Sequence, residues 1–277
     1  MSRTWRIQAG AILAGLLFTV AVRAYADELP KVVTADGLTL AYRISLPAPS
    51  SPDAPAEPGP YPVALLVHDY GGSMQDWLKG NPLPEDLHKA GFAVVAFDLR
   101  GHGESTKAPK PVSYMYIAKD GWQVLGKDFG TLLKSLSTVK TLDFSRVVVV
   151  AAGWGSLQVV GYYPKDVKPS ALLLATPKAD TFVGDGELLA KSAARWAKTP
   201  VWVLACKDAP GNDAALSFAS KLNKENTHVE DRDCKQPLYG AQLFGEDPQW
   251  TADLVKDLAG SLPAKAAPAE GQPAPTG

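Results

Sequence analysis

Short apolar runs, rich in β-branched residues, recur along the chain and alternate with longer stretches that have a helical pattern. The runs lie at 63–67, 93–97, 147–151, 171–175 and 201–205. A run that is apolar at every position is typical of a strand with both faces buried, as in a parallel sheet covered by helices. Helices are expected at about 83–90, 121–137, 155–163, 186–197, 213–224 and 248–261. The pattern therefore predicts an α/β fold with a mostly parallel central sheet, helices on both faces and a single domain.

The composition supports a folded chain and argues against one class of partner. Of the 277 residues, 46% are hydrophobic and 21% are charged, which is enough apolar material for a sizeable core. The 28 basic and 29 acidic side chains give a formal net charge of −1. Because nucleic-acid binding depends on a basic excess, we expect no nucleic-acid partner.

The N-terminus has the parts of a secretory signal peptide. Arg3 and Arg6 give a basic start, residues 7–22 carry no charge, and Ala26 ends a small-x-small cleavage site. The uncharged stretch is shorter than the roughly 20 residues that a membrane-crossing helix needs. We therefore expect residues 1–26 to be removed and the protein to be exported, periplasmic or secreted, without stable membrane insertion. An uncleaved anchor is the alternative.

The exported part is expected to form an α/β domain at 27–262. Residues 47–62 are rich in proline, which fits neither a helix interior nor a central strand, so this segment predicts an extended surface loop. Residues 263–277 are Ala, Pro, Gly and polar groups with nothing to bury, which predicts a disordered tail.

The two cysteines, Cys206 and Cys234, both lie in the exported part. In an oxidising compartment such a pair is more often a disulfide than a metal site, and this bridge would contribute roughly 3–4 kcal/mol of stability. Two buried thiols that never meet are the alternative. The four histidines are scattered, without CxxC or HxxxH spacing, so we expect neither a metal site nor a cofactor.

Two segments resemble loops of the α/β-hydrolase family, in particular its small bacterial esterase and dienelactone-hydrolase-like branch. Residues 65–73, Leu-Leu-Val-His-Asp-Tyr-Gly-Gly-Ser, with Trp77, are similar to the strand and HG loop that supplies one amide of the oxyanion hole. Residues 96–105, Ala-Phe-Asp-Leu-Arg-Gly-His-Gly-Glu-Ser, resemble the DxRGHGxS loop after the next strand. The resemblance extends from about Thr39 to Leu262 and implies the α/β-hydrolase fold.

The family places its nucleophile at a sharp strand-to-helix turn, the elbow, between small residues. The small flanks Ala151 and Gly155 centre this elbow on Gly153, where the family has serine. Ser156 is the fallback nucleophile, but its neighbours two positions away, Trp154 and Gln158, are bulky. The alternative is that Ser156 is an ordinary residue of the first helical turn, where its hydroxyl satisfies a backbone group.

The acid and the histidine should follow the nucleophile in that order. Asp208 comes just past the run 201–205 and is the candidate acid, although aspartate is equally common as a turn residue. Tyr239-Gly240 lies where the family has His-Gly. The last histidine, His228, begins the preceding strand and lies ~20 Å from its carboxyl end, too far to act as the base.

Two histidines lie nearer the expected pocket. His68 and His102 follow their strands directly, at family positions that usually have a structural role. His102, with Ser156 or Ser105, is the fallback for catalysis. The amides near Tyr70 and Trp154 are expected to bind a carbonyl or carboxylate oxygen. Aromatic residues are expected to line an apolar pocket: Tyr70, Trp77, Tyr114, Tyr116, Trp122, Trp154 and Tyr239.

These residues predict an exported, catalytically degenerate homologue of the hydrolases that binds a small carbonyl or carboxylate ligand. An active ester hydrolase with an unconventional site is one alternative. A cell-envelope interaction or scaffold protein, with the proline-rich loop and the tail as contact segments, is the other. No motif identifies a protein partner.

Overall fold

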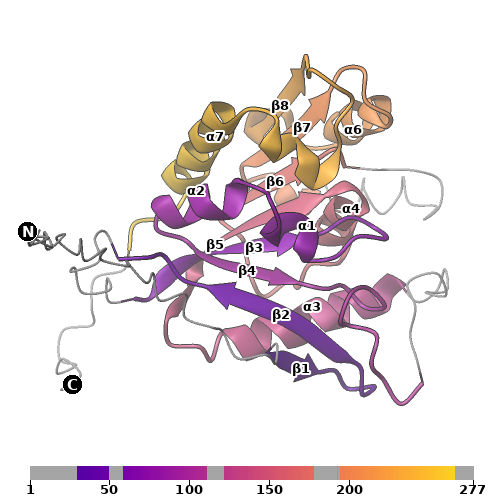
Figure 1. The fold of residues 1–277 in the computed structure, drawn as a ribbon, viewed down its shortest axis with the longest axis vertical. Helices are drawn as coiled ribbons and strands as arrows, with labels where there is room; N and C mark the ends of the chain where they lie inside the picture. Colours follow the sequence, from indigo (N-terminus) through magenta and orange to yellow (C-terminus); the bar gives the residue numbers. More distant parts are fainter. Residues whose placement is uncertain (1–29, 50–58, 111–121, 178–191, 193, 266–277) are drawn as a thin grey trace, which may run out of the picture.

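The computed structural model describes residues 30–49, 59–110, 122–177, 192 and 194–265, which build an eight-stranded sheet with helices on both faces (Figure 1). The strand order is β1-β2-β4-β3-β5-β6-β7-β8. β2 runs antiparallel to both β1 and β4, and β3 to β8 run parallel to one another. The strands are β1 (Lys31–Val33), β2 (Thr39–Ser45), β3 (Tyr61–Val67), β4 (Ala93–Phe97), β5 (Leu142–Ala152), β6 (Ala171–Ala175), β7 (Val201–Cys206) and β8 (Thr227–Arg232). This sheet confirms the predicted α/β class.

The helices cover the two faces of this sheet. In Figure 1, α2 and α7 lie on one side of it and α3 lies on the other. The α-helices are α1 (Gln75–Leu78), α2 (Leu83–Lys89), α3 (Trp122–Leu136), α4 (Gly153–Tyr162), α6 (Asn212–Ala219) and α7 (Pro248–Gly260); the 3₁₀ helices are η3 (Ala194–Trp196), η4 (Lys224–Asn226) and η5 (Gly240–Gly245). None of the helices described is long and apolar enough to cross a membrane.

The core has two layers because successive side chains of a strand point to opposite faces. In β5, Val147 and Val149 pack in one layer with α3 and α4, whereas Val148 and Val150 pack in the other with α1, α2 and α7. All four are fully buried. The continuous apolar runs are therefore explained by a sheet that has no solvent-facing side over its central strands.

Several predicted boundaries shift. β3 begins at Tyr61, inside the segment predicted as the loop 47–62, because its first residues pair with the early extension of β5 that starts at Leu142. The helix predicted at 213–224 ends at Ala219 instead. Asn223 then starts a separate 3₁₀ turn, since its side chain accepts a hydrogen bond from the amide of Glu225.

Some predictions fall on residues outside the described ranges. These include the signal peptide 1–26, residues 50–58 of the proline-rich loop and residues 266–277 of the tail. Of the helix predicted at 186–197, the structure describes Ser192, which is helical, and 194–197, which include the short η3.

Cys206 and Cys234 form the predicted disulfide, with their Cα atoms 5.6 Å apart. Cys206 ends β7, and Cys234 lies two residues beyond β8, its parallel neighbour. The bridge therefore ties together the two chain segments that leave these strands at the carboxyl edge of the sheet.

Candidate functional site

The elbow follows β5 directly and is built by two glycines. Ala152 is extended, Gly153 has a φ of +50°, and α4 begins there. A left-handed residue is what turns a strand into a helix without a connecting loop, and glycine adopts it without strain. Gly155 is needed for a different reason: a Cβ there would lie 2.3 Å from the carbonyl oxygen of His68. The structure therefore centres the turn on Gly153.

The carboxylate of Asp69 occupies the place that a side chain on Gly153 would take. Asp69 lies in the loop after β3, and a Cβ on Gly153 would be only 2.1 Å from its Cγ. Its Oδ1 accepts hydrogen bonds from the amides of Tyr70 and Trp154, both at 2.7 Å. These are the two amides expected to form the oxyanion hole. They do bind an oxygen, and that oxygen belongs to the protein itself.

His68 fixes the backbone of this loop. Its Nε2 accepts a hydrogen bond from the amide of Leu99 at 2.9 Å, so the ring proton is on Nδ1, which donates to the carbonyl of Asp69 at 2.6 Å. Burial lowers the pKa of His68 to about 4. The ring is therefore neutral at neutral pH, and its two nitrogens link the backbone of Asp69 to that of Leu99.

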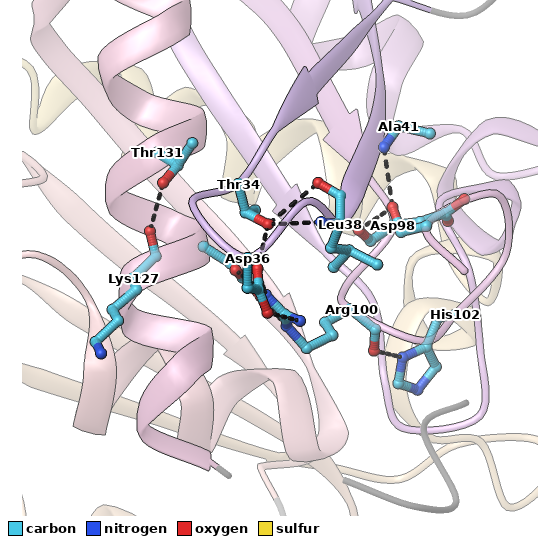
Figure 2. Close-up of polar contacts among 11 residues, drawn as sticks. Thr34, Asp36, Leu38, Ala41, Asp98, Arg100, His102, Lys127 and Thr131 are labelled. Atoms are coloured by element: carbon cyan, nitrogen blue, oxygen red, sulfur yellow. Dashed lines mark hydrogen bonds and ion pairs between the residues drawn. The ribbon is translucent and has the colours of Figure 1, made fainter. Parts of the chain in front are cut away.

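His102 supports the same loop from the other side. Its Nε2 accepts from the amide of Gly71 at 3.1 Å, and its Nδ1 donates to the carbonyl of Arg100 at 2.9 Å, a contact drawn in Figure 2. Burial, and then the neighbouring His68, lower the pKa of His102 to about 4. Both ring nitrogens of this candidate base are thus bonded to backbone groups.

The motif at 98–105 is held together by its own polar groups. The two carboxylate oxygens of Asp98 accept from the amides of Met74 and Glu104, at 2.7 and 2.8 Å. The hydroxyl of Ser105, which is fully buried, donates to the carbonyl of Asp98. These bonds fasten the loop after β4 to the start of α1.

Arg100 extends this network toward β1. Its guanidinium lies between two carboxylates, with hydrogen bonds of 2.7 and 3.0 Å to Asp36 and two of 2.7 Å to Asp128 of α3. Figure 2 shows Arg100 beside Asp36 in the turn between β1 and β2. Arg100 and Asp128 are both only 6% exposed, so this is a buried ion pair. Hydrogen bonding to Arg100 holds the pKa of Asp36 well below its usual range.

The other site residues expected from the sequence are more dispersed. Ser156 is fully buried in α4, and its hydroxyl donates to the carbonyl of Ala151 at 3.0 Å. Asp208 is exposed in the turn after β7. Tyr239 is 43% exposed at the start of η5.

Asp69 and Tyr239 line one cavity of about 760 Å³ at the carboxyl edge of the sheet. Its described lining residues do not include Asp208 or any histidine. They are mainly polar or small: Asp69, Asp76, Lys79, Gly80, Asn81, Ala152, Gln236, Pro237, Leu238, Tyr239, Gly240, Ala241, Gln242, Gly245 and Glu246. Within the part of the chain that the structure describes, no group of three or more His, Cys, Asp or Glu residues could hold a metal ion.

Of the aromatic residues expected to line a pocket, Tyr239 lines this cavity, whereas Tyr70, Trp77 and Trp154 are not among its described lining residues. Trp77 is fully buried and packs against Phe244 instead. Trp154 is 5% exposed, with its ring edge-to-face against Tyr70, 5.5 Å between centroids. Large aromatic side chains bury much apolar area when they pack in the core, which explains why Tyr239 is the one aromatic among the described lining residues. Tyr114, Tyr116 and the side chain of Trp122 lie outside what the structure describes.

Thr176, at the end of β6, positions the loop that carries Tyr239. Its hydroxyl accepts a hydrogen bond of 2.6 Å from the amide of Gly240. Thr176 is itself buried with a φ of +43°, a left-handed conformation that is uncommon for a β-branched residue. The surrounding structure therefore holds a strained residue in order to anchor the rim of the cavity.

Sequence reasoning missed Asp69 and Thr176. For Asp69 a signal existed, because it follows His68 at the place of the glycine in the HG loop. For Thr176 there was none, since a single threonine after an apolar run does not indicate a left-handed conformation.

Comparison with known proteins identifies a family. A family model described as the alpha/beta hydrolase fold matches residues 62–202. Bifunctional epoxide hydrolase 2 from Sus scrofa is 32% identical over 120 residues, which is 42% of this chain and 19% of that protein. The chain thus spans about a fifth of the length of this curated relative.

Solved structures of esterases share the fold at low sequence identity. The Pyrococcus furiosus esterase Pf2001 superposes with a TM-score of 0.59 at 15% identity, over 85% of this chain and 90% of the esterase. Est1E from Butyrivibrio proteoclasticus gives a TM-score of 0.59 at 12% identity, over 84% and 99% of the two chains. The family model and the shared fold agree with the sheet order and the elbow, and the chain belongs to the α/β-hydrolase fold family.

Proposed function

We propose that this protein is an exported, catalytically degenerate member of the family that binds a small molecule in the cavity and does not hydrolyse it. The observation that carries the proposal is the pair formed by Gly153 and Asp69. The elbow has no side chain, and the volume that a nucleophile would need is filled by the Asp69 carboxylate.

The two described histidines nearest the elbow do not suit the role of a catalytic base, which supports the same proposal. A covalent hydrolase needs a base beside its nucleophile to take and return a proton. Tyr239 stands where the family has this histidine. His68 and His102 each accept one backbone amide and donate to one backbone carbonyl. Their low pKa values also make them poor proton acceptors at neutral pH.

The fallback nucleophiles give little support to an active enzyme. Ser156 and Ser105 are both fully buried. Each hydroxyl donates to a backbone carbonyl of its own neighbourhood, Ala151 and Asp98 respectively. A substrate would have to break these contacts and reach through the core before either oxygen could attack it.

Export is part of the proposal. The apolar N-terminal segment with its cleavage site motivates it, and the disulfide between Cys206 and Cys234 is consistent with an oxidising compartment. A small ligand is the proposed partner, because a cavity of about 760 Å³ is within the range of small-molecule sites.

An activity assay tests the proposal. The mature protein is mixed with p-nitrophenyl acetate and butyrate, and separately with a fluorophosphonate probe that labels activated serines. We expect no burst of nitrophenol and no covalent labelling. Labelling of the wild type that disappears in Ser156→Ala or Ser105→Ala would contradict the proposal and favour the unconventional hydrolase.

A thermal-shift screen tests the binding half. A library of small polar molecules is added to the mature protein, and a ligand that prefers the folded state raises the melting temperature. Substituting Gln242, an exposed residue of the cavity lining, by alanine should reduce the shift for a ligand bound there. A screen without any stabilising compound would favour the scaffold alternative.

A further inference from the structure

We infer that Asp69 is the resident ligand of the oxyanion hole and determines which molecules the cavity accepts. The inference rests on the proposed function and deepens it, because it concerns the same cavity. It changes the expected ligand class: the site rejects carbonyl, carboxylate and phosphate oxygens at the elbow and takes neutral or cationic polar molecules.

The hydrogen-bond geometry at Asp69 is that of a filled oxyanion hole. Two amides, that of Tyr70 in the loop after β3 and that of Trp154 in the first turn of α4, converge on a single oxygen at 2.7 Å. Oxyanion holes place their donors 2.7–3.1 Å from a negatively charged oxygen. The Trp154 amide belongs to the residue after the elbow glycine, so the carboxylate oxygen lies where a reacting carbonyl oxygen would be held.

The carboxylate is held in place by more than these two bonds. The carbonyl of Asp69 accepts from His68, and the amide of Gly71 donates to His102, so the backbone on both sides is fixed to buried rings. Gly153 leaves room for the carboxylate, since any side chain there would overlap it.

An outside ligand must compete with this internal group. Even a short flexible tether gives an effective concentration in the millimolar range, and a rigidly placed group exceeds that. Displacing Asp69 also gives up two hydrogen bonds to a charged acceptor. Free carboxylates at millimolar concentration are therefore not expected to enter the hole.

The charge of the cavity favours the same selection. Its described lining residues include three with acidic side chains, Asp69, Asp76 and Glu246, and one with a basic side chain, Lys79. These carboxylates repel an anion that enters the cavity, and the amides of Tyr70 and Trp154 are already occupied by Asp69.

The amide protons of Tyr70 and Trp154 give a direct readout by NMR. In ¹⁵N-labelled wild-type protein we expect both resonances far downfield and unchanged by added butyrate. In Asp69→Gly we expect both to move upfield and then to shift back as butyrate binds, with a dissociation constant at least about tenfold lower than in the wild type. Asp76→Asn is the matched control, because Asp76 lines the same cavity but accepts from the amide of Ser73.

Two results would overturn the inference. One is butyrate binding to the wild type through both amides as tightly as to Asp69→Gly. The other is an Asp69→Gly protein whose two amide resonances stay where they are in the wild type. If Asp69→Gly does not fold, Asp69→Asn keeps the shape with a neutral acceptor, and upfield movement of both resonances supports the inference while unchanged resonances contradict it.

The test is independent of catalysis. Ester hydrolysis by the wild type would contradict the proposed function, but the resonances of the two amides would still report whether Asp69 occupies the oxyanion hole. Butyrate binding to both amides of the wild type would instead contradict the inference, while the proposed function, a non-hydrolytic binding protein, would stand.

Discussion

The loop after β4 and the loop after β3 lie side by side at the same edge of the sheet, yet they differ in what their residues do. In the first, the family-like residues Asp98 and Arg100 bond to other parts of the protein, and Ser105 bonds both to Asp98 within the loop and to Ala41 of β2. In the second, a family glycine is replaced by Asp69, which fills the elbow. The family-like residues of the first loop therefore hold the fold together, whereas the second loop places a carboxylate where a side chain of the elbow would lie.

The largest expected effect is in the structural loop. Arg100→Ala would leave the buried carboxylate of Asp128 without its ion pair, which costs about 3–5 kcal/mol of unfolding free energy. Urea denaturation measures the loss. Lys89→Ala is the control, because Lys89 pairs with Glu85 at an exposed site, and solvent-exposed ion pairs contribute little to stability. Equal effects of the two changes would mean that the motif is not kept for stability.

The second prediction concerns the elbow. Gly153→Ser should cost about 2–4 kcal/mol, because its side chain overlaps the Asp69 carboxylate and its φ of +50° is unfavourable for serine. Asp69→Gly should remove the overlap, so the double variant is more stable than Gly153→Ser alone. A double-mutant cycle measures this coupling. Additive effects would show that the carboxylate does not occupy the nucleophile's place.

The same cycle sharpens the test for lost catalysis. Gly153→Ser combined with Tyr239→His supplies the serine and the histidine proposed for these positions but leaves Asp69 on the amides of Tyr70 and Trp154, so we expect no esterase activity. Adding Asp69→Gly opens the hole. A folded triple variant that remains inactive would put the alignment of the triad positions in doubt.

The third prediction is a loss of stability in acid. The pKa values of His68 and His102 are near 4 in the folded protein and near 6.5 in the unfolded chain, so the unfolded state binds more protons between these values. The stability is fully present above pH 6.5 and falls as the pH drops toward 4. We expect each histidine to contribute a loss of roughly 2 kcal/mol in unfolding free energy between pH 7 and pH 5, measured by urea denaturation at several pH values.

A glutamine variant separates this effect from other titrations. In His102→Gln the amide oxygen can replace Nε2 as the acceptor for Gly71 but does not titrate. The absolute stability of the variant is not the readout; the slope of stability against pH should fall. An unchanged slope would assign the acid sensitivity to other groups.

Much of the fold could be predicted because the information is local. Each apolar run marks a strand, and the small residues around Gly153 mark the elbow, as the sheet and the strand-to-helix turn show. The short α1 and η5 were not expected, since four to six residues leave no periodic pattern.

The site was predictable only in part because its decisive contact is not local. Asp69 and Trp154 are 85 positions apart in the sequence, and nothing near either residue indicates that they meet. Trp77 was expected to line the pocket for a related reason. The sequence does not distinguish a tryptophan of the core from one that lines a cavity.

The smallest expected effect is at the rim of the cavity. Thr176→Val keeps the β-branched shape but removes the acceptor of the buried Gly240 amide, which should cost about 1–2 kcal/mol. Thr176→Ser keeps the hydroxyl and is the matched control. Hydrogen exchange at Gly240 should become faster in the valine variant than in the serine variant. If the two variants exchange alike, the threonine hydroxyl does not anchor the Tyr239 loop, and the rim is held by packing instead.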